Sequence, residues 1–270
     1  MDSSLVKDDL YLMDALLRPL RKCMTYRPAF GQGGREGLSV EQFQDLYGQD
    51  LFYSWLGLND PLIYAAHKAA GGLTSVYRQL GVGCELLFRT ILSRKLSLSG
   101  EQLDWSYEYR KPNRTSGVHK LDAKIAVSDL EQHNQVVFNA WLESAYTSVR
   151  TSKDSMSSLR GVVFEVRQGY KSADSKRQNA DLRFGMRAYQ EQLLPVFALL
   201  SSQISSPVAR RYRSDGMLVL VGCDDPDPTV STFAFFSEVI GFDLVSFFQR
   251  NSDKLKSEVH DVVAHLLTPS

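Results

Sequence analysis

The sequence predicts an α/β fold in which a mixed central β-sheet is flanked by helices and is preceded by a mostly helical N-terminal region. Three observations predict it. Apolar residues recur at helical spacing before residue 100, the pattern alternates as in strands after Gly100, and two continuous apolar runs follow later. Continuous apolar runs are typical of strands covered on both faces, and strands interleaved with helices indicate a layered core.

The N-terminal region, residues 1–100, is expected to be built from helices. A first helix carries regularly spaced leucines and should end at Pro19 and the basic Arg21-Lys22. The Gly-rich segment 31–37 precedes a helix start and does not follow a strand, so we interpret it as a flexible linker or lid. Asp60-Pro61 opens a helix that Gly71-Gly72 should stop, and another helix follows around residues 82–92.

The expected α/β core spans residues 101–223. Segments 104–110 and 118–127 alternate in polarity around turn-forming residues and predict a hairpin. The remaining expected elements are a helix over 129–150, a strand over 161–168, a helix from an N-cap at Asp174 to about Gln192, and strands over 194–200 and 217–221. Residues 224–270 should form closing helices from about Thr232 to Leu267 that pack on the core, so that the three regions make one compact unit.

Composition narrows the class of protein. The chain has 270 residues, 43% of them hydrophobic, which can fill a core and excludes disorder for most of it. No apolar run approaches the roughly 18 residues of a membrane span, and the N-terminus is too polar for a secretory signal. Three widely spaced cysteines (Cys23, Cys84 and Cys223) form neither a disulfide framework nor a CxxC metal site, so we expect a cytoplasmic protein without membrane contact.

The formal net charge is zero, with 31 Lys and Arg against 31 Asp and Glu, but the charge is unevenly distributed. From Asp224 onward there are 8 acids and 3 bases, a balance of −5, which leaves +5 on the preceding residues. A nucleic-acid partner is therefore compatible with the composition.

Two carboxylates are candidates for chemistry. Asp122 lies in one expected strand and Glu165 in another, and Arg167 shares a face with Glu165 because side chains at i and i+2 project together. Two neighbouring carboxylates repel each other unless a divalent cation lies between them, and such a pair suits Mg²⁺. This arrangement predicts metal-assisted hydrolysis of a phosphodiester, although a structural salt bridge explains the same spacing.

Basic and amide side chains near these acids are suited to DNA phosphates and base edges. The candidate DNA contacts are Arg110, Lys111, Arg114, Tyr170, Lys176, Arg177, Gln178, Asn179, Arg210, Arg211 and Arg213. The histidines, by contrast, show no metal-ligand spacing and are expected to be isolated surface or core residues: His67, His119, His133, His260 and His265.

Residues 162–181, Val-Val-Phe-Glu-Val-Arg-Gln-Gly-Tyr-Lys-Ser-Ala-Asp-Ser-Lys-Arg-Gln-Asn-Ala-Asp, together with Ala209-Arg-Arg-Tyr-Arg-Ser and Met217-Leu-Val-Leu-Val-Gly, resemble type II restriction endonucleases of the PD-(D/E)xK superfamily. The order of elements over residues 104–222 is also similar to that family's core. The resemblance implies a restriction-endonuclease-like core and a Mg²⁺-dependent enzyme that cuts double-stranded DNA at a short sequence. It also implies a homodimer in a bacterial restriction system, with a companion DNA methyltransferase.

Carried over by position, Asp122 matches the first acid of the family motif and Glu165 the second. This chain has Arg167 where the family has lysine, so either Arg167 substitutes or Lys171 reaches back into the site; a proton-handling role fits Lys171 better, because arginine stays charged. Leu121 stands where the family has proline before the first acid. Glu108 is therefore the alternative first acid, and Glu85 is a possible additional one, unless it pairs with Arg89.

Two other functions fit the sequence. One is a non-catalytic DNA-binding or interaction protein on the same fold, in which the acids are salt-bridged to Arg167. The other is a metabolic α/β enzyme that acts on a small phosphorylated or otherwise anionic substrate.

Overall fold

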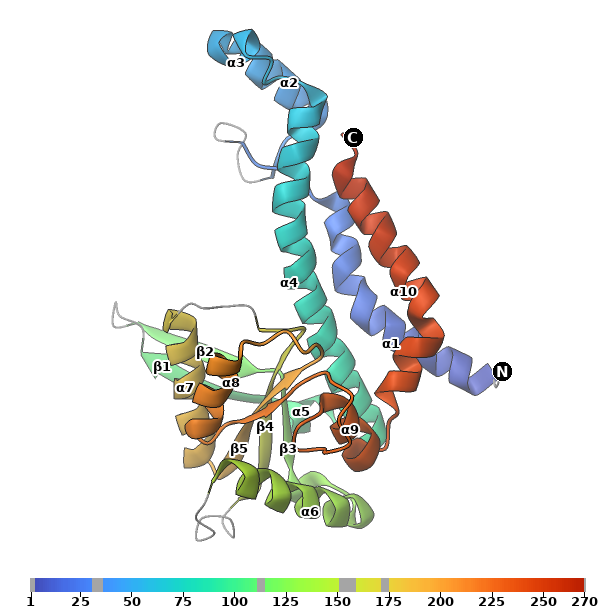
Figure 1. Ribbon diagram of the computed structural model, residues 1–270, viewed down its shortest axis with the longest axis vertical. Coiled ribbons are helices and arrows are strands. Elements are labelled where there is room, and N and C mark those ends of the chain that lie inside the picture. The colour runs from blue at the N-terminus through green and yellow to red at the C-terminus, as the bar shows by residue number, and fades with distance from the viewer. Residues whose placement is uncertain (1–2, 31–35, 111–114, 151–158, 171–174, 270) are drawn as a thin grey trace. The chain divides into compact units, whose positions relative to one another are not determined.

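The computed structural model describes residues 3–30, 36–110, 115–150, 159–170 and 175–269 (Figure 1). The helices are α1 (Ser3–Arg21), η1 (Lys22–Thr25), α2 (Val40–Gln49), α3 (Leu51–Trp55), α4 (Pro61–Leu96), α5 (Gly100–Leu103), η2 (Val127–Asp129), α6 (Gln132–Val149), α7 (Ser175–Gln190), α8 (Ser206–Ser214), α9 (Thr232–Ala234), η4 (Phe235–Ile240) and α10 (Leu244–Leu267). The strands are β1 (Trp105–Arg110), β2 (Ser116–Leu121), β3 (Ala123–Ala126), β4 (Gly161–Arg167), β5 (Leu193–Leu199) and β6 (Leu218–Leu220).

The chain divides into two compact units, and the division differs from the expected boundaries at residues 100 and 223. The helical unit comprises Met1–Gly83 with Gln249–Ser270, and the sheet unit comprises Cys84–Phe248. Both boundaries therefore fall inside the continuous helices α4 and α10. A boundary inside a helix is not marked by a change in composition or by turn residues, which is why the sequence did not reveal it.

One expected helix end is wrong, and another is confirmed. Gly71 and Gly72 lie within α4, which runs without a break from Pro61 to Leu96. A Cβ at Gly71 would overlap the Tyr26 hydroxyl and one at Gly72 would overlap Leu266, so these glycines permit close packing inside the helical unit. The first helix, α1, ends at Arg21, two residues after Pro19, as expected.

The helical unit is held together by aromatic packing and by ion pairs between distant segments. Phe30, Phe43 and Tyr64 form a buried aromatic cluster. Arg250 on α10 donates to both carboxylate oxygens of Asp9 on α1, at 2.6 and 2.8 Å. These contacts join the first and last parts of the chain into one unit.

The sheet unit contains a four-stranded mixed sheet in the order β3-β4-β5-β6 and a separate β1-β2 hairpin. Strand β3 is antiparallel to β4, whereas β4, β5 and β6 are mutually parallel. The predicted α/β class with a mixed sheet is confirmed. One helix was not predicted: the basic segment between β5 and β6 belongs to α8, which connects these two strands. Parallel neighbours need such a crossover, and Pro207 begins it in the first helical turn.

Helices cover both faces of the four-stranded sheet (Figure 1). On one face, Phe184 of α7 and Tyr212 of α8 pack against Phe197 of β5. On the other face, Phe164 of β4 contacts Phe88 of α4 and Phe235 of η4. Every residue of β5 and β6 is buried, as the continuous apolar runs predicted.

No single helix in the described part of the chain is long and apolar enough to cross a membrane. Residues Thr232–Ile240 and Leu244–Leu267 reach the required length and apolar content only together, across a bend of 119°.

Candidate carboxylate site

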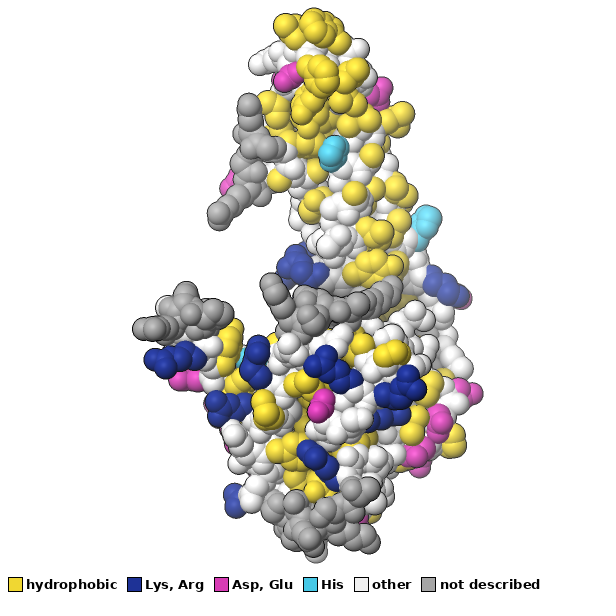
Figure 2. All heavy atoms as spheres, turned by 60° about the vertical axis from the view of Figure 1, so that its left-hand side comes forward, with side chains coloured by type: hydrophobic (Ala, Val, Ile, Leu, Met, Phe, Trp, Pro, Cys, Tyr) yellow, Lys and Arg dark blue, Asp and Glu magenta, His cyan; other side chains and the backbone are white. Residues whose placement is uncertain are grey.

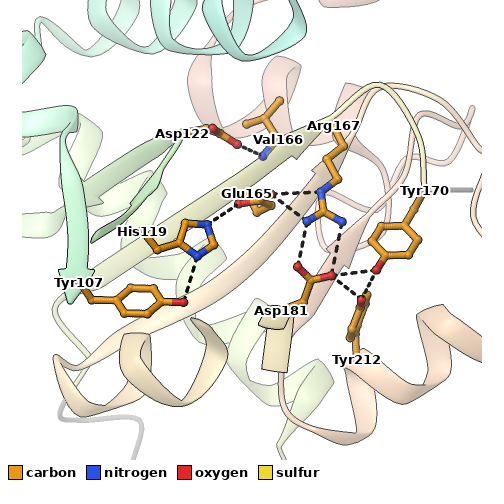
Figure 3. A network of polar contacts seen from close by, with 9 residues as sticks. All are labelled: Tyr107, His119, Asp122, Glu165, Val166, Arg167, Tyr170, Asp181 and Tyr212. Carbon is orange, nitrogen blue, oxygen red and sulfur yellow. Dashed lines mark hydrogen bonds and ion pairs between the residues drawn. The ribbon is translucent and has the colours of Figure 1, made fainter. Parts of the chain in front are cut away.

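Asp122 and Glu165 lie next to each other on neighbouring segments of the sheet (Figure 3). The antiparallel register pairs Ala123 with Phe164, and Asp122 is an extra residue before this pair because its N–H also bonds to Phe164, the residue that precedes Glu165. Asp122 follows β2 directly and is held at its position by two hydrogen bonds: its N–H donates to the Phe164 carbonyl at 3.1 Å, and its Oδ2 accepts from the N–H of Val166 at 2.6 Å. The predicted proximity of these two carboxylates is therefore confirmed.

A third carboxylate, Glu85 on α4, lies close enough to interact electrostatically with the pair. Burial, followed by the charges of Glu165 and Glu85, raises the pKa of Asp122 to about 8. Burial and the charge of Glu165 raise the pKa of Glu85 to about 7. Arg89, the partner that we considered for Glu85, instead donates to the Asp122 carbonyl at 2.8 Å and to Asp104 at 2.8 Å. Crowding of acids is thus a property of this site, and it favours protonation or a counter-cation.

Arg167 connects Glu165 to a buried polar network. Its guanidinium lies 2.8 Å from Oε1 of Glu165 and 2.9 Å from Oδ1 of Asp181 on α7. The hydroxyls of Tyr170 and Tyr212 lie 2.8 and 2.7 Å from Oδ2 of Asp181. Burial lowers the pKa of Arg167, but the two carboxylates more than offset this effect and raise it overall. The arginine is therefore a permanent cation that orients Glu165.

A second chain of contacts reaches Glu165 from the hairpin. Nδ1 of His119 lies 3.1 Å from the Tyr107 hydroxyl, and Nε2 lies 4.0 Å from Oε2 of Glu165. Tyr107 and His119 are direct partners in the β1-β2 register, so both project from the same face of the hairpin. Figure 3 shows His119 on the opposite side of Glu165 from Arg167.

Glu108, the alternative first acid, does not belong to this site. It alternates with Tyr107 along β1 and therefore projects from the other face of the hairpin, where it is exposed. This corrects the expectation that Glu108 could replace Asp122.

The described residues contain no group of three or more His, Cys, Asp or Glu side chains arranged to hold a metal ion. One oxygen of each paired carboxylate is already engaged: Oδ2 of Asp122 by Val166 and Oε1 of Glu165 by Arg167. Within the described part of the chain, Oδ1 of Asp122 and Oε2 of Glu165 receive no hydrogen bond. The pair can thus offer two oxygens to a cation.

The candidate DNA contacts fall into three groups: exposed residues, buried residues, and residues whose side chains lie outside the described part of the chain. Arg110, Asn179, Arg210, Arg211 and Arg213 are exposed. Two of these arginines make contacts within the sheet unit, because Arg211 donates to Gln178 and Asn179, at 2.7 and 3.0 Å, and Arg213 donates to the Val219 carbonyl at 3.1 Å. Figure 2 shows Lys and Arg side chains spread over one face of the sheet unit rather than gathered in one patch.

Tyr170 and Gln178 are buried, at 4% and 8% exposure, which corrects the expectation that they face a ligand. Their polar atoms are directed to Asp181 and Arg211 respectively. Lys111, Arg114 and Lys171 lie outside the described residues. Lys176 and Arg177 lie in the first turn of α7, and their side chains are outside what the structure describes.

Sequence reasoning missed Asp181 and His119. Asp181 is the last residue of the segment 162–181, but only the fold shows that its position on α7 brings it to Arg167. His119 sits at an alternating position of a strand and two residues before Leu121, but only the hairpin register shows that it faces Glu165.

Comparison of the chain with protein-family models, with characterised proteins and with solved structures gives no match.

Proposed function

We propose that the sheet unit is a Mg²⁺-dependent endonuclease of the PD-(D/E)xK type that hydrolyses phosphodiester bonds in double-stranded DNA. The observation that carries the proposal is the placement of Asp122 next to Glu165 on adjacent segments of a mixed sheet, with a third carboxylate, Glu85, nearby. Placing negative charge on all three groups in a partly buried site is costly, and a divalent cation offsets that cost.

The donor set fits Mg²⁺. This ion is commonly held by one or two carboxylates, with water and substrate phosphate completing its coordination. Asp122 and Glu165 would hold it through Oδ1 and Oε2, the oxygens that accept no hydrogen bond within the described part of the chain. When bound, the ion activates water and neutralises charge on the phosphate.

Arg167 has a positioning role in this proposal. It fixes Oε1 of Glu165. Its guanidinium group forms ion pairs with two carboxylates, those of Glu165 and Asp181, and its side chain is only 10% exposed. Because arginine stays charged, it does not exchange protons with water during the reaction. The motif lysine role therefore belongs to Lys171 in this proposal, a residue outside the described part of the chain.

Further parts of the proposal rest on the resemblance of residues 162–181 to type II restriction enzymes. They are recognition of a short DNA sequence, a homodimeric state, a bacterial cytoplasmic location and a companion methyltransferase. Exposed Arg110 and Arg210 are available for DNA phosphates, whose contacts position a protein on the duplex.

The test is cleavage of supercoiled plasmid by the full chain with Mg²⁺, with EDTA as the control. Asp122→Asn and Glu165→Gln should each abolish cutting and retain DNA binding, because each removes one anionic ligand but keeps the side-chain shape. Glu108→Gln is the matched control, since this exposed acid projects from the other face of the hairpin, and it should cut at the wild-type rate. Wild-type cutting by Glu165→Gln would refute the assigned site.

A second candidate function is DNA binding without catalysis. It is favoured by the ion pairs of Arg167 with Glu165 and Asp181, which neutralise the acids without a metal. In that case the plasmid stays intact, DNA binding weakens steeply as salt rises, and Mg²⁺ does not protect the protein against unfolding.

A further inference from the structure

Glu165 is held from two sides by two different kinds of contact. Arg167 fixes Oε1 through hydrogen bonds of 2.8 and 3.1 Å, and it is itself anchored by buried Asp181. Oε2, the oxygen available to a cation, faces Nε2 of His119 at 4.0 Å. The His119 side chain is 33% exposed and that of Arg167 only 10%, so His119 is on the open side of Glu165.

The hairpin determines which nitrogen of His119 faces Glu165. The Tyr107 hydroxyl lies 3.1 Å from Nδ1. Burial raises the pKa of Tyr107, so the phenol keeps its proton and can donate it to Nδ1. A neutral imidazole that accepts at Nδ1 carries its hydrogen on Nε2, the nitrogen directed at Glu165.

We propose that His119, held by Tyr107, is a positioning residue that orients Oε2 of Glu165 for the divalent cation. The proposal rests on the proposed function, because it assumes that Glu165 is a ligand. A carboxylate oxygen has more than one lone pair, so Oε2 can face both a cation and the N–H of His119. The 4.0 Å separation is longer than a hydrogen bond, and a small rotation of either side chain would close it.

The expected effect follows from what such outer contacts do in other metal sites. Residues that hydrogen-bond to a ligand commonly change metal affinity by about 10- to 100-fold when they are replaced. His119→Leu should therefore weaken cation binding by about 10-fold or more. His119→Gln should retain most of the affinity, because the glutamine amide places a donor near the position of Nε2. His119→Asn should resemble His119→Leu, because its shorter amide reaches only the position of Nδ1.

The experiment measures Mn²⁺ binding to the full chain without DNA, from the electron paramagnetic resonance signal of the free ion. Mn²⁺ is a suitable probe because it shares the octahedral oxygen preference of Mg²⁺. The Mn²⁺ bound by Asp122→Asn is subtracted from the Mn²⁺ bound by each protein, which excludes cation bound elsewhere on the protein. His133→Leu is the matched control, since His133 also faces a glutamate, Glu131 at 3.6 Å, but on the exposed surface of the same unit.

A 10-fold loss in His119→Leu, recovery in His119→Gln and no change in His133→Leu support the proposal. Thermal unfolding of each variant checks that it is folded. If His119→Leu does not fold, the comparison of His119→Asn with His119→Gln gives the result. Equal Mn²⁺ affinity in the wild type and in His119→Leu or His119→Asn overturns the positioning role but leaves the carboxylate site intact. Absence of Mn²⁺ binding to the wild type overturns the carboxylate site itself, and the positioning role with it.

Discussion

The Arg167–Asp181 pair provides the sharpest test of how this site is built, through the substitution Asp181→Ala. Asp181 is 4% exposed, contacts Arg167 at 2.9 Å and lies within 2.8 Å of two tyrosine hydroxyls. The substitution removes all of these contacts and leaves Arg167 with Glu165 as its one carboxylate partner among the described residues.

The cost can be worked out from the contacts that are lost. Breaking a buried ion pair costs about 3 to 5 kcal/mol, because the remaining charge stays buried without its partner. A buried hydroxyl left without an acceptor costs roughly 1 to 3 kcal/mol. Two compensations act in the opposite direction: Glu165 still neutralises Arg167, and the Tyr212 hydroxyl still lies 2.7 Å from the Tyr170 hydroxyl. We therefore expect the free energy of unfolding to fall by about 3 to 5 kcal/mol.

The assay is urea unfolding followed by tryptophan fluorescence in a Trp55→Phe background. Trp55 is the tryptophan of the helical unit and is 77% exposed. The other two, Trp105 and Trp141, are buried in the sheet unit, and Trp105 belongs to the same apolar cluster as Tyr170 and Tyr212. The fluorescence transition then reports on the unit that carries the substitution, and circular dichroism on the same samples checks whether the units unfold together.

A loss below about 1 kcal/mol would refute the reasoning, because that is the contribution of a solvent-exposed ion pair. The double variant Arg167→Met, Asp181→Ala provides the control. It also removes the cation that neutralises Glu165, so it should be less stable than Asp181→Ala alone if Arg167 still pairs with Glu165 in the single variant.

Three further outcomes test other parts of the structure. Asp122→Asn should flatten the pH dependence of stability. The folded-state pKa of Asp122 is raised from 3.8 to about 8, so the wild type becomes less stable as the pH rises between these values. Urea unfolding at pH 4 and pH 9 without metal measures this loss, and an equal loss in the wild type and the variant would contradict the prediction. Gly161→Ala should lower stability by about 1 to 3 kcal/mol, because a Cβ would overlap the Ile125 carbonyl oxygen on the neighbouring strand, and an unchanged thermal midpoint would argue against the β3-β4 pairing. Burial raises the pKa of Cys84 to about 12, so a thiol reagent should label half-buried Cys223 in the native protein before it labels Cys84. Peptide mass spectrometry gives the order of labelling, and labelling of Cys84 first would contradict its burial.

Sequence patterns predict this structure well where the structural property depends only on neighbouring residues in the chain. Alternation predicted the β1-β2 hairpin, but its expected second strand, 118–127, is divided: β2 ends at Leu121, and Ala123–Ala126 form β3 in the other sheet. Continuous apolar runs predicted β5 and β6 as strands buried on both faces. Spacing of two residues predicted that Glu165 and Arg167 share a face, and they form an ion pair at 2.8 Å. These predictions hold because strand geometry is set by neighbouring residues in the chain.

Predictions that depend on packing partners failed. Gly71-Gly72 looks like a helix stop, but the space each glycine leaves is taken by Tyr26 or Leu266. Tyr170 lies in a basic segment and was expected to face DNA, whereas α7 and α8 close over it and its hydroxyl meets Asp181. In both cases the deciding residue is distant in sequence, so no local pattern could reveal it.

For this protein the sequence by itself determined the α/β class and most strands, and it predicted that Asp122 and Glu165 lie close together. The tertiary structure decided which groups surround these two acids. The pairing of β3 with β4 brings Asp122 next to Glu165. The hairpin directs His119 to one side of Glu165, and α7 brings Asp181 to the other. The reason is physical: periodicity depends on neighbours along the chain, whereas the charge and orientation of a carboxylate depend on groups that only folding brings within a few ångströms.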